Sequence, residues 1–186
     1  YWPYLNIDCE YYTTSCDVCQ RVKSIRPSPL QLRSMLPSYP LELLYMDYLT
    51  INNQMILVLQ DSFSKFAKAY IASSSDGVHT AQYLLDYFLT YGVPTRISSD
   101  NGSNLRSREV ANLLESFNIQ HDYSPSRAPY SHGMIERMNS SLLTLLRSFR
   151  SNSDWISQLP YLIFSYNITR NSTTGVAPAT IFFGRQ

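Results

Sequence analysis

The segment between residues 98 and 139 organises this chain. It begins with SSDNGS at residues 98–103 and ends with YSHGMIERMN at residues 130–139. Asp100 follows an apolar-flanked turn, and Glu136 lies thirty-five intervening residues further on, just inside a predicted helix. A third acid, Asp47, lies upstream in a strand-like run. Three such carboxylates predict a divalent metal site that cuts or joins nucleic acid.

The composition fits one soluble domain with a small appendage. The chain has 186 residues, of which 44% are hydrophobic and 16% are charged, values that are ordinary for a globular protein. No apolar run approaches the roughly 18–20 residues that a membrane span needs, so we predict no membrane association. The chain begins with Tyr1 and not with Met, and we expect it to be an internal piece of a longer polyprotein.

Charge is distributed unevenly along the chain. Residues 20–41 carry a net charge of +4, residues 42–126 of −4 and residues 127–186 of +4. An acidic centre between basic flanks suits a metal-binding core that also binds a polyanion. Chance scatter explains imbalances of this size equally well, so the pattern supports a nucleic-acid partner only in combination with other features.

The N-terminal residues 1–20 are rich in aromatic side chains and are predicted to be helical. Cys16 and Cys19 form a Cys-x-x-Cys pair, which is half of a tetrahedral zinc site. Cys9 is the only other cysteine in the sequence. An odd number of cysteines argues against a disulfide framework. Either the missing zinc ligands precede Tyr1 or no zinc is bound.

Prolines divide the chain into two parts. Residues 21–40 contain four prolines among serine and arginine residues and show no periodicity, which is typical of a linker. We therefore predict a small N-terminal segment at residues 1–20, a linker at 21–40 and a main domain at 41–186.

Alternation and apolar runs predict the first strands of the main domain. Residues 43–51 alternate and are rich in β-forming side chains, residues 55–60 form a near-continuous apolar run, and residues 63–71 form a third candidate strand. These three strands are predicted to form an antiparallel meander. Asp61, which follows the second of them, is interpreted as a structural turn acid.

The remaining chain alternates helices with short strands. Asp76 is predicted to cap a helix that ends at Gly92. Ser107 is predicted to cap the next helix, whose apolar face would be Val110, Ala111, Leu114 and Phe117. The other predicted elements are strands at residues 95–98 and 118–123, helices at 131–149 and 154–167, and a short apolar tail at 178–183. This order predicts an α/β fold with a mixed five-stranded sheet flanked by helices.

Several short motifs surround the three acids. They are PLELLYMD at residues 40–47, DSFSK at 61–65, YGVP at 91–94, SDNG at 99–102 and GMIERMN at 133–139. Further motifs are DW at 154–155, YN at 166–167, NSTTG at 171–175 and FGR at 183–185. Together these motifs resemble the integrases of long-terminal-repeat retrotransposons, of the gypsy and Pao types, over nearly the whole chain.

The resemblance implies the ribonuclease H-like fold of the retroviral integrase catalytic core. Residues 41–186 would be that core. Residues 1–20 would be the C-terminal half of a His-His-Cys-Cys zinc domain, in which Cys16 and Cys19 match the cysteine pair. Zinc would bind only if the histidine half is present upstream.

The resemblance also implies the chemistry. Asp47, Asp100 and Glu136 would be the catalytic residues and would hold two Mg²⁺ or Mn²⁺ ions. The reactions would be processing of DNA 3′ ends and transfer of those ends into target DNA. The implied partners are element DNA and target DNA, bound by a homo-multimer that acts in the nucleus after a cytoplasmic phase.

Residues near the acids are candidates for DNA contacts. Asn139 shares a helix face with Glu136, and the alternative for this side chain is simple solvation; Arg137 could follow phosphates or be an ordinary exposed arginine. The complete predicted set of DNA-binding residues is Asn101, Tyr130, Ser131, His132, Arg137, Asn139 and Ser140.

Two other functions stay open at this point. A domesticated or degenerate integrase would bind DNA without catalysis. A ribonuclease H would cleave RNA–DNA hybrids, although that family usually needs a fourth acid at a different spacing. The three acids in their spacing favour the integrase.

Overall fold

The computed structural model describes residues 2–15, 37–51, 53–103, 105–123 and 155–185. The chain forms two compact units, Tyr1–Leu36 and Pro37–Gln186, and their division falls within the predicted linker. Helix α1 (Leu5–Ser15) belongs to the first unit and carries the exposed Cys9. Cys16 and Cys19, the predicted half zinc site, lie outside the described residues.

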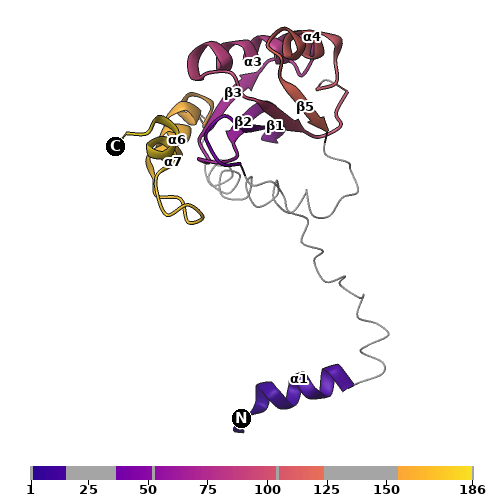
Figure 1. The fold of residues 1–186 in the computed structure, drawn as a ribbon, viewed down its shortest axis with the longest axis vertical. Helices are drawn as coiled ribbons and strands as arrows, with labels where there is room; N and C mark the ends of the chain where they lie inside the picture. Colours follow the sequence, from indigo (N-terminus) through magenta and orange to yellow (C-terminus); the bar gives the residue numbers. More distant parts are fainter. Residues whose placement is uncertain (1, 16–36, 52, 104, 124–154, 186) are drawn as a thin grey trace. The chain divides into compact units, whose positions relative to one another are not determined.

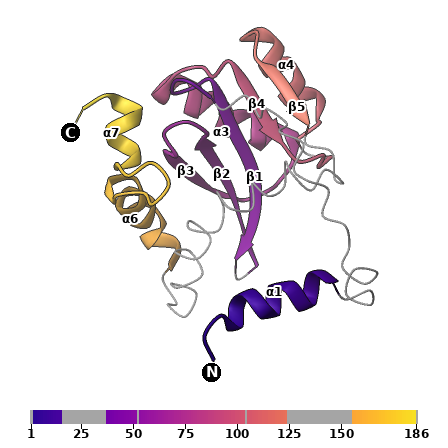
Figure 2. The same cartoon turned by 60° about the horizontal axis from the view of Figure 1, so that its bottom comes forward.

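The second unit is built on a mixed five-stranded sheet with the strand order β3-β2-β1-β4-β5 (Figures 1 and 2). Strand β1 pairs antiparallel with β2, which pairs antiparallel with β3, whereas β1, β4 and β5 run parallel. The sheet and its antiparallel meander confirm the prediction. The strands are β1 (Leu43–Ile51), β2 (Gln54–Asp61), β3 (Ala67–Ala72), β4 (Arg96–Ser99) and β5 (Gln120–Tyr123).

Strand β2 supplies side chains to both faces of the sheet. Leu57 and Leu59 belong to one buried cluster, and Ile56 and Val58 belong to another. Side chains alternate between the two faces of a strand, so the continuous apolar run MILVL at residues 55–59 is what a strand covered on both sides requires.

Helices cover the two faces of the sheet. α3 (Gly77–Tyr91) and α4 (Arg108–Ser116) lie side by side over one face (Figure 1), where Leu84 and Leu114 join the first cluster. α6 (Trp155–Ile168) packs on the other face, and α7 (Pro178–Phe183) lies beside it (Figure 2). The chain is thus a sheet between two helical layers, as predicted from its element order.

The predicted caps are present. Asp76 accepts a hydrogen bond from the His79 amide at 2.9 Å at the start of α3. Ser107 accepts one from the Val110 amide at 3.3 Å at the start of α4. Gly92 ends α3 with a φ of 111°, which L side chains rarely adopt.

Three predictions about local structure were wrong. The third strand begins at Ala67, because residues 62–65 form a turn in which Lys65 has a φ of 68°. The predicted apolar tail is a helix, α7, and its Phe182 ring stacks on Phe66 at 4.5 Å. Ala111, predicted on the apolar face of α4, is exposed, whereas Leu113 packs against the core in its place.

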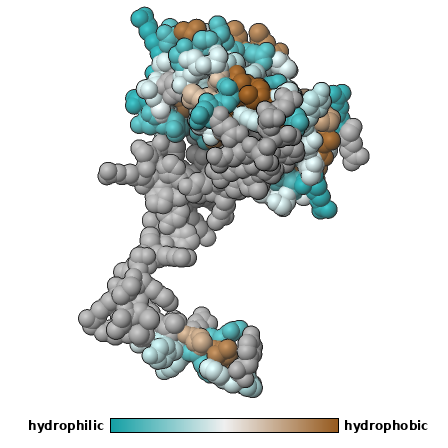
Figure 3. Space-filling view, turned by 180° about the vertical axis from the view of Figure 1, so that it is seen from behind, coloured by the Kyte–Doolittle hydropathy of each residue, from teal (hydrophilic) through white to brown (hydrophobic). Residues whose placement is uncertain are grey.

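Apolar side chains on the surface form small areas set among polar ones on the face that Figure 3 shows. The most exposed large apolar side chains of the second unit are Leu89, Tyr161 and Phe164, at 76%, 74% and 62%. No helix in the described part of the chain is long and apolar enough to cross a membrane.

Candidate active site

Two of the three predicted acids lie on neighbouring parallel strands. Asp47 is in the middle of β1, and Asp100 directly follows the last residue of β4. The register pairs Met46 with Ser99, so the next residue along each strand sets Asp47 beside Asp100. Neighbouring strands are about 4.8 Å apart, so the backbones of the two acids are close enough for their carboxylates to share one cation.

The two acids also share a face of the sheet. Leu44 and Met46 point into the cluster under α3 and α4, whereas Leu49 and Ile51 point to the α6 side. Alternation therefore places Asp47 on the α6 side. Ile97 points to the α3 and α4 side, and the same alternation continued by one residue places Asp100 with Asp47.

The turn after β4 orients the Asp100 carboxylate. Asp100 Oδ1 accepts a hydrogen bond from the Gly102 amide at 3.0 Å, the pattern of an Asx turn. The Asp100 side chain is exposed, and Asp47 is half-buried. Asn101, a predicted DNA contact, is exposed next to Asp100. A backbone hydrogen bond thus orients the Asp100 carboxylate, which remains exposed to solvent.

A serine and a histidine lie directly behind this turn. Ser99 is 1% exposed, and its Oγ lies 2.9 Å from the Asp100 carbonyl oxygen and 2.9 Å from His121 Nε2. Burial lowers the pKa of the His121 imidazole, and the Asp122 carboxylate opposes this shift. Sequence reasoning did not single out either residue.

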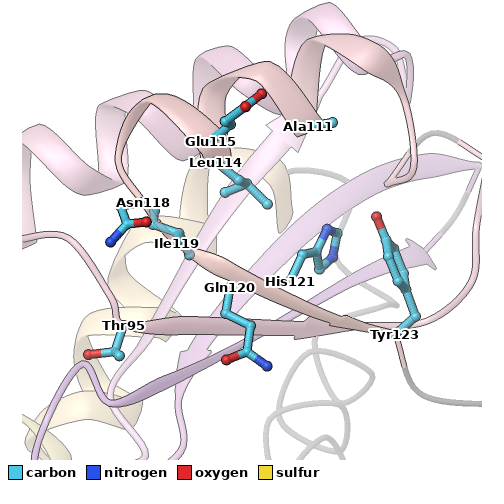
Figure 4. Close-up of a pocket in the computed structure, with 9 residues that line it drawn as sticks. All are labelled: Thr95, Ala111, Leu114, Glu115, Asn118, Ile119, Gln120, His121 and Tyr123. Atoms are coloured by element: carbon cyan, nitrogen blue, oxygen red, sulfur yellow. The ribbon is translucent and has the colours of Figure 1, made fainter.

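His121 lies in a groove of about 550 Å³ between α4 and β5 (Figure 4). Its ring packs on Tyr123 with centroids 4.1 Å apart, and the Arg106 guanidinium lies 5.1 Å from the Tyr123 ring centroid. Figure 4 shows both rings on the α4 side of β5, with Gln120 directed away from them. Neither Asp47 nor Asp100 lines this groove.

Asp61 has a different environment. It is 0% exposed, and its carboxylate accepts hydrogen bonds from the Leu41 amide at 2.8 Å and from the Ser64 amide at 2.7 Å. The Ser64 hydroxyl donates a third bond at 2.5 Å. The two Ser64 bonds close the turn between β2 and β3, and the Leu41 bond ties this turn to the segment before β1. This confirms the structural interpretation of Asp61.

The paired acids fit a divalent cation. Carboxylate oxygens are the hard ligands that Mg²⁺ and Mn²⁺ prefer. Asp47 lies within β1, and Asp100 directly follows the neighbouring strand β4. Within the described residues, no three His, Cys, Asp or Glu side chains gather into a metal site. The third predicted ligand, Glu136, lies outside the described residues, as do the other predicted DNA contacts, Tyr130, Ser131, His132, Arg137, Asn139 and Ser140.

The arrangement of the sheet and its helices is found in a solved structure. The crystal structure of the catalytic core domain of BIV integrase matches with a TM-score of 0.66 and 23% sequence identity, over 77% of this chain and 94% of that chain. The fold is therefore that of the ribonuclease H-like class, as the element order and the resemblance implied.

Sequence comparison identifies the family. Residues 37–129 match the family described as integrase core domain. Because this match covers half of the 186 residues, the chain belongs to the integrase core domain family. This confirms the resemblance found in the motifs.

Relatives at the sequence level are polyproteins. The retrovirus-related Pol polyprotein from transposon opus of Drosophila melanogaster is 29% identical over 100% of this chain and 19% of its own length. The Pro-Pol polyprotein of feline foamy virus is 26% identical over 99% of this chain and 16% of its own length. The chain thus spans less than a fifth of the length of these relatives.

Proposed function

We propose that this chain is the catalytic core of a DNA integrase that uses divalent metal to process DNA 3′ ends and to transfer them into target DNA. The observation that carries the proposal is the register of β1 and β4, which sets Asp47 beside Asp100 on one face of the sheet. Family membership alone would be compatible with a chain that had lost these acids.

Both reactions replace one phosphodiester oxygen by another. In the first, water attacks near the 3′ end and releases the terminal nucleotides. In the second, the new 3′-hydroxyl attacks a target phosphodiester, and the target strand leaves through its own 3′-oxygen. Two bound Mg²⁺ or Mn²⁺ ions would activate the attacking oxygen and stabilise the leaving one.

The residues of this chain position the reacting groups. Asp47 and Asp100 are the proposed metal ligands from the sheet, and Glu136 is the proposed third ligand. The Gly102 amide orients the Asp100 carboxylate, so that little reorganisation is needed when charge develops. Asn101, exposed beside Asp100, is a proposed contact for the DNA strand.

The wider biological setting is also a proposal. The names of the relatives point to a piece of a Pol polyprotein, which we propose acts as a homo-multimer on element ends and target DNA. We propose a nuclear site of action reached after a cytoplasmic phase. The Cys16 and Cys19 pair is proposed to bind zinc only in a longer chain that supplies two histidines.

The decisive experiment is an assay of Mn²⁺-dependent strand transfer, and of its reversal, on branched DNA. We expect activity from the 186-residue chain and none from Glu136→Gln, which should fold and bind DNA non-specifically like the parent. Glu115→Gln, at an exposed acid of α4, serves as the matched control, because it makes the same residue change and removes the same charge. If the parent chain binds DNA but shows neither activity nor metal binding at millimolar Mg²⁺, it is a binding module only. Cleavage of RNA–DNA hybrids instead of DNA ends would favour a ribonuclease H.

A further inference from the structure

The hydrogen bonds behind Asp100 have a defined direction. Ser99 Oγ contacts both the Asp100 carbonyl oxygen and His121 Nε2, each at 2.9 Å. A serine hydroxyl has one proton to donate, and a carbonyl oxygen can only accept. Both contacts are hydrogen bonds only if Ser99 donates to the Asp100 carbonyl and His121 Nε2–H donates to Ser99 Oγ.

The His121 imidazole, which donates the first of these hydrogen bonds, is itself held in place. Its ring packs on Tyr123 with centroids 4.1 Å apart, and Tyr123 is flanked by the Arg106 guanidinium at 5.1 Å. The register pairs Ile97 with His121, so β5 presents the ring on the α4 side of the sheet, where the Ser99 side chain also points. The hydrogen bonds from His121 to Ser99 and from Ser99 to the Asp100 carbonyl form a relay. The side chains of this relay lie on the α4 side of the sheet, opposite the face that carries the Asp47 and Asp100 carboxylates.

Asp100 is consequently held at two points. Its carbonyl accepts from Ser99 Oγ, and its carboxylate Oδ1 accepts from the Gly102 amide at 3.0 Å. Together these bonds restrict the backbone and the side chain of an otherwise exposed residue. Residues that hydrogen-bond behind a metal ligand typically control its orientation.

We propose that Ser99 and His121 are positioning residues for Asp100, which hold its carboxylate in the orientation that a divalent cation requires. This inference rests on the proposed function, because it takes Asp100 to be a metal ligand. Neither side chain needs to touch the metal or the DNA. His121 acts only through Ser99.

Mn²⁺ affinity, measured by the electron paramagnetic resonance signal of the free ion, tests the proposal. We expect Ser99→Ala and His121→Phe each to weaken Mn²⁺ binding by about 10-fold. His121→Phe keeps a ring for packing on Tyr123 but removes the N–H. His121→Gln returns an amide N–H near the position of Nε2, and its affinity should stay within about twofold of the parent.

The double variant tests whether His121 affects Mn²⁺ affinity through Ser99 or independently of it. If His121 acts through Ser99, then Ser99→Ala combined with His121→Phe should bind Mn²⁺ no more weakly than Ser99→Ala alone. Ser116→Ala is the matched control, because Ser116 Oγ donates to the Leu113 carbonyl at 2.7 Å on the outside of α4. That control should bind Mn²⁺ like the parent.

The outcomes distinguish this inference from the proposed function. Unchanged affinity in both single variants, multiplied losses in the double variant, or no rescue by His121→Gln would overturn the positioning roles while leaving the integrase proposal in place. Failure of the parent chain to bind Mn²⁺, or equal binding by Asp100→Asn, would overturn the proposed function and the inference with it. Urea unfolding of each variant verifies that the measured protein is folded.

Discussion

Two turns of this sheet each begin with an aspartate, and the two carboxylates differ in almost every physical respect. Asp61 ends β2, is fully buried, and receives hydrogen bonds from two amides and one hydroxyl. Asp100 follows β4, is exposed, and receives one amide hydrogen bond at a single oxygen. Both stand in sequence as an acid after a strand, followed by small polar residues.

The difference teaches how a structural acid is distinguished from a functional one. A buried carboxylate must be saturated by donors, because an unpaired buried charge is costly. Asp61 has three donors and is closed to solvent, so a cation cannot reach it. An exposed carboxylate fixed by one backbone amide is oriented and can still bind a cation. The number of protein donors, and not position after a strand, separates the two roles.

The largest expected effect is on activity, at Asp100. Asp100→Asn should lower Mn²⁺-dependent strand transfer by about 1,000-fold or more, because a metal ligand supports several kcal/mol of transition-state stabilisation. Its free energy of unfolding should stay within about 0.5 kcal/mol of the parent, as for other surface substitutions. Asp122→Asn, the same change on β5, should leave activity unchanged. If Asp100→Asn retains strand-transfer activity, Asp100 is not a functional acid, and the contrast between it and the structural Asp61 does not hold.

The next effect is on stability, at Asp61. Asp61→Ala should lower the free energy of unfolding by about 3 kcal/mol, because it leaves the Leu41 and Ser64 amides without their acceptor in a buried turn. Urea unfolding monitored by tryptophan fluorescence measures this loss. Glu115→Ala, at an exposed acid of α4, is the control and should change stability little. If the free energy of unfolding of Asp61→Ala equals that of the parent, the hydrogen bonds to Asp61 do not stabilise the fold as their burial predicts.

The smallest effect concerns Asp76, an acid that is exposed and yet structural. Hydrogen bonds from the backbone and side chain of His79 hold the pKa of the Asp76 carboxyl below its usual value. A lowered pKa in the folded state means that the carboxylate stabilises the fold above the unfolded-state pKa, and that this stabilisation is lost as pH falls through the folded-state pKa. The parent should therefore be more stable than Asp76→Ala at about pH 6, and the gap should close towards about pH 3. Thermal unfolding at both pH values checks this sign. If the difference in stability between the parent and Asp76→Ala does not change with pH, the Asp76 cap acts without its negative charge.

Much of the fold could be predicted from periodicity and caps. The continuous apolar run of β2, the cap residues Asp76 and Ser107, and the stop at Gly92 are local signals, and local signals are present in a single sequence. The third strand was placed too early because Phe63 and Phe66 favour a strand. Hydrogen bonds from residues 61–66 to one another, which close the turn, outweigh that propensity.

The site was predictable only in part. The motifs and spacing pointed to Asp47, Asp100 and Glu136, and the structure brings the first two together, while their role as metal ligands stays a prediction. Ser99 and His121 were missed because their contact depends on the parallel register of β4 and β5. Register between distant strands is a tertiary property, and neither residue has a local pattern that reveals it.

The unequal lengths of the strands imply a gradient of protection against hydrogen exchange across the site. β1 has nine residues between two partner strands, and β2 beside it is buried on both faces, so their amides should exchange only through global opening. β4 and β5 have four residues each, and shorter ladders open at lower cost. Asp47 therefore stands on the slowest-exchanging part of the molecule, and Asp100 on a part that can open locally. The pair thus joins a carboxylate on a long central strand to one that follows a short strand, whose backbone hydrogen bonds open at lower cost.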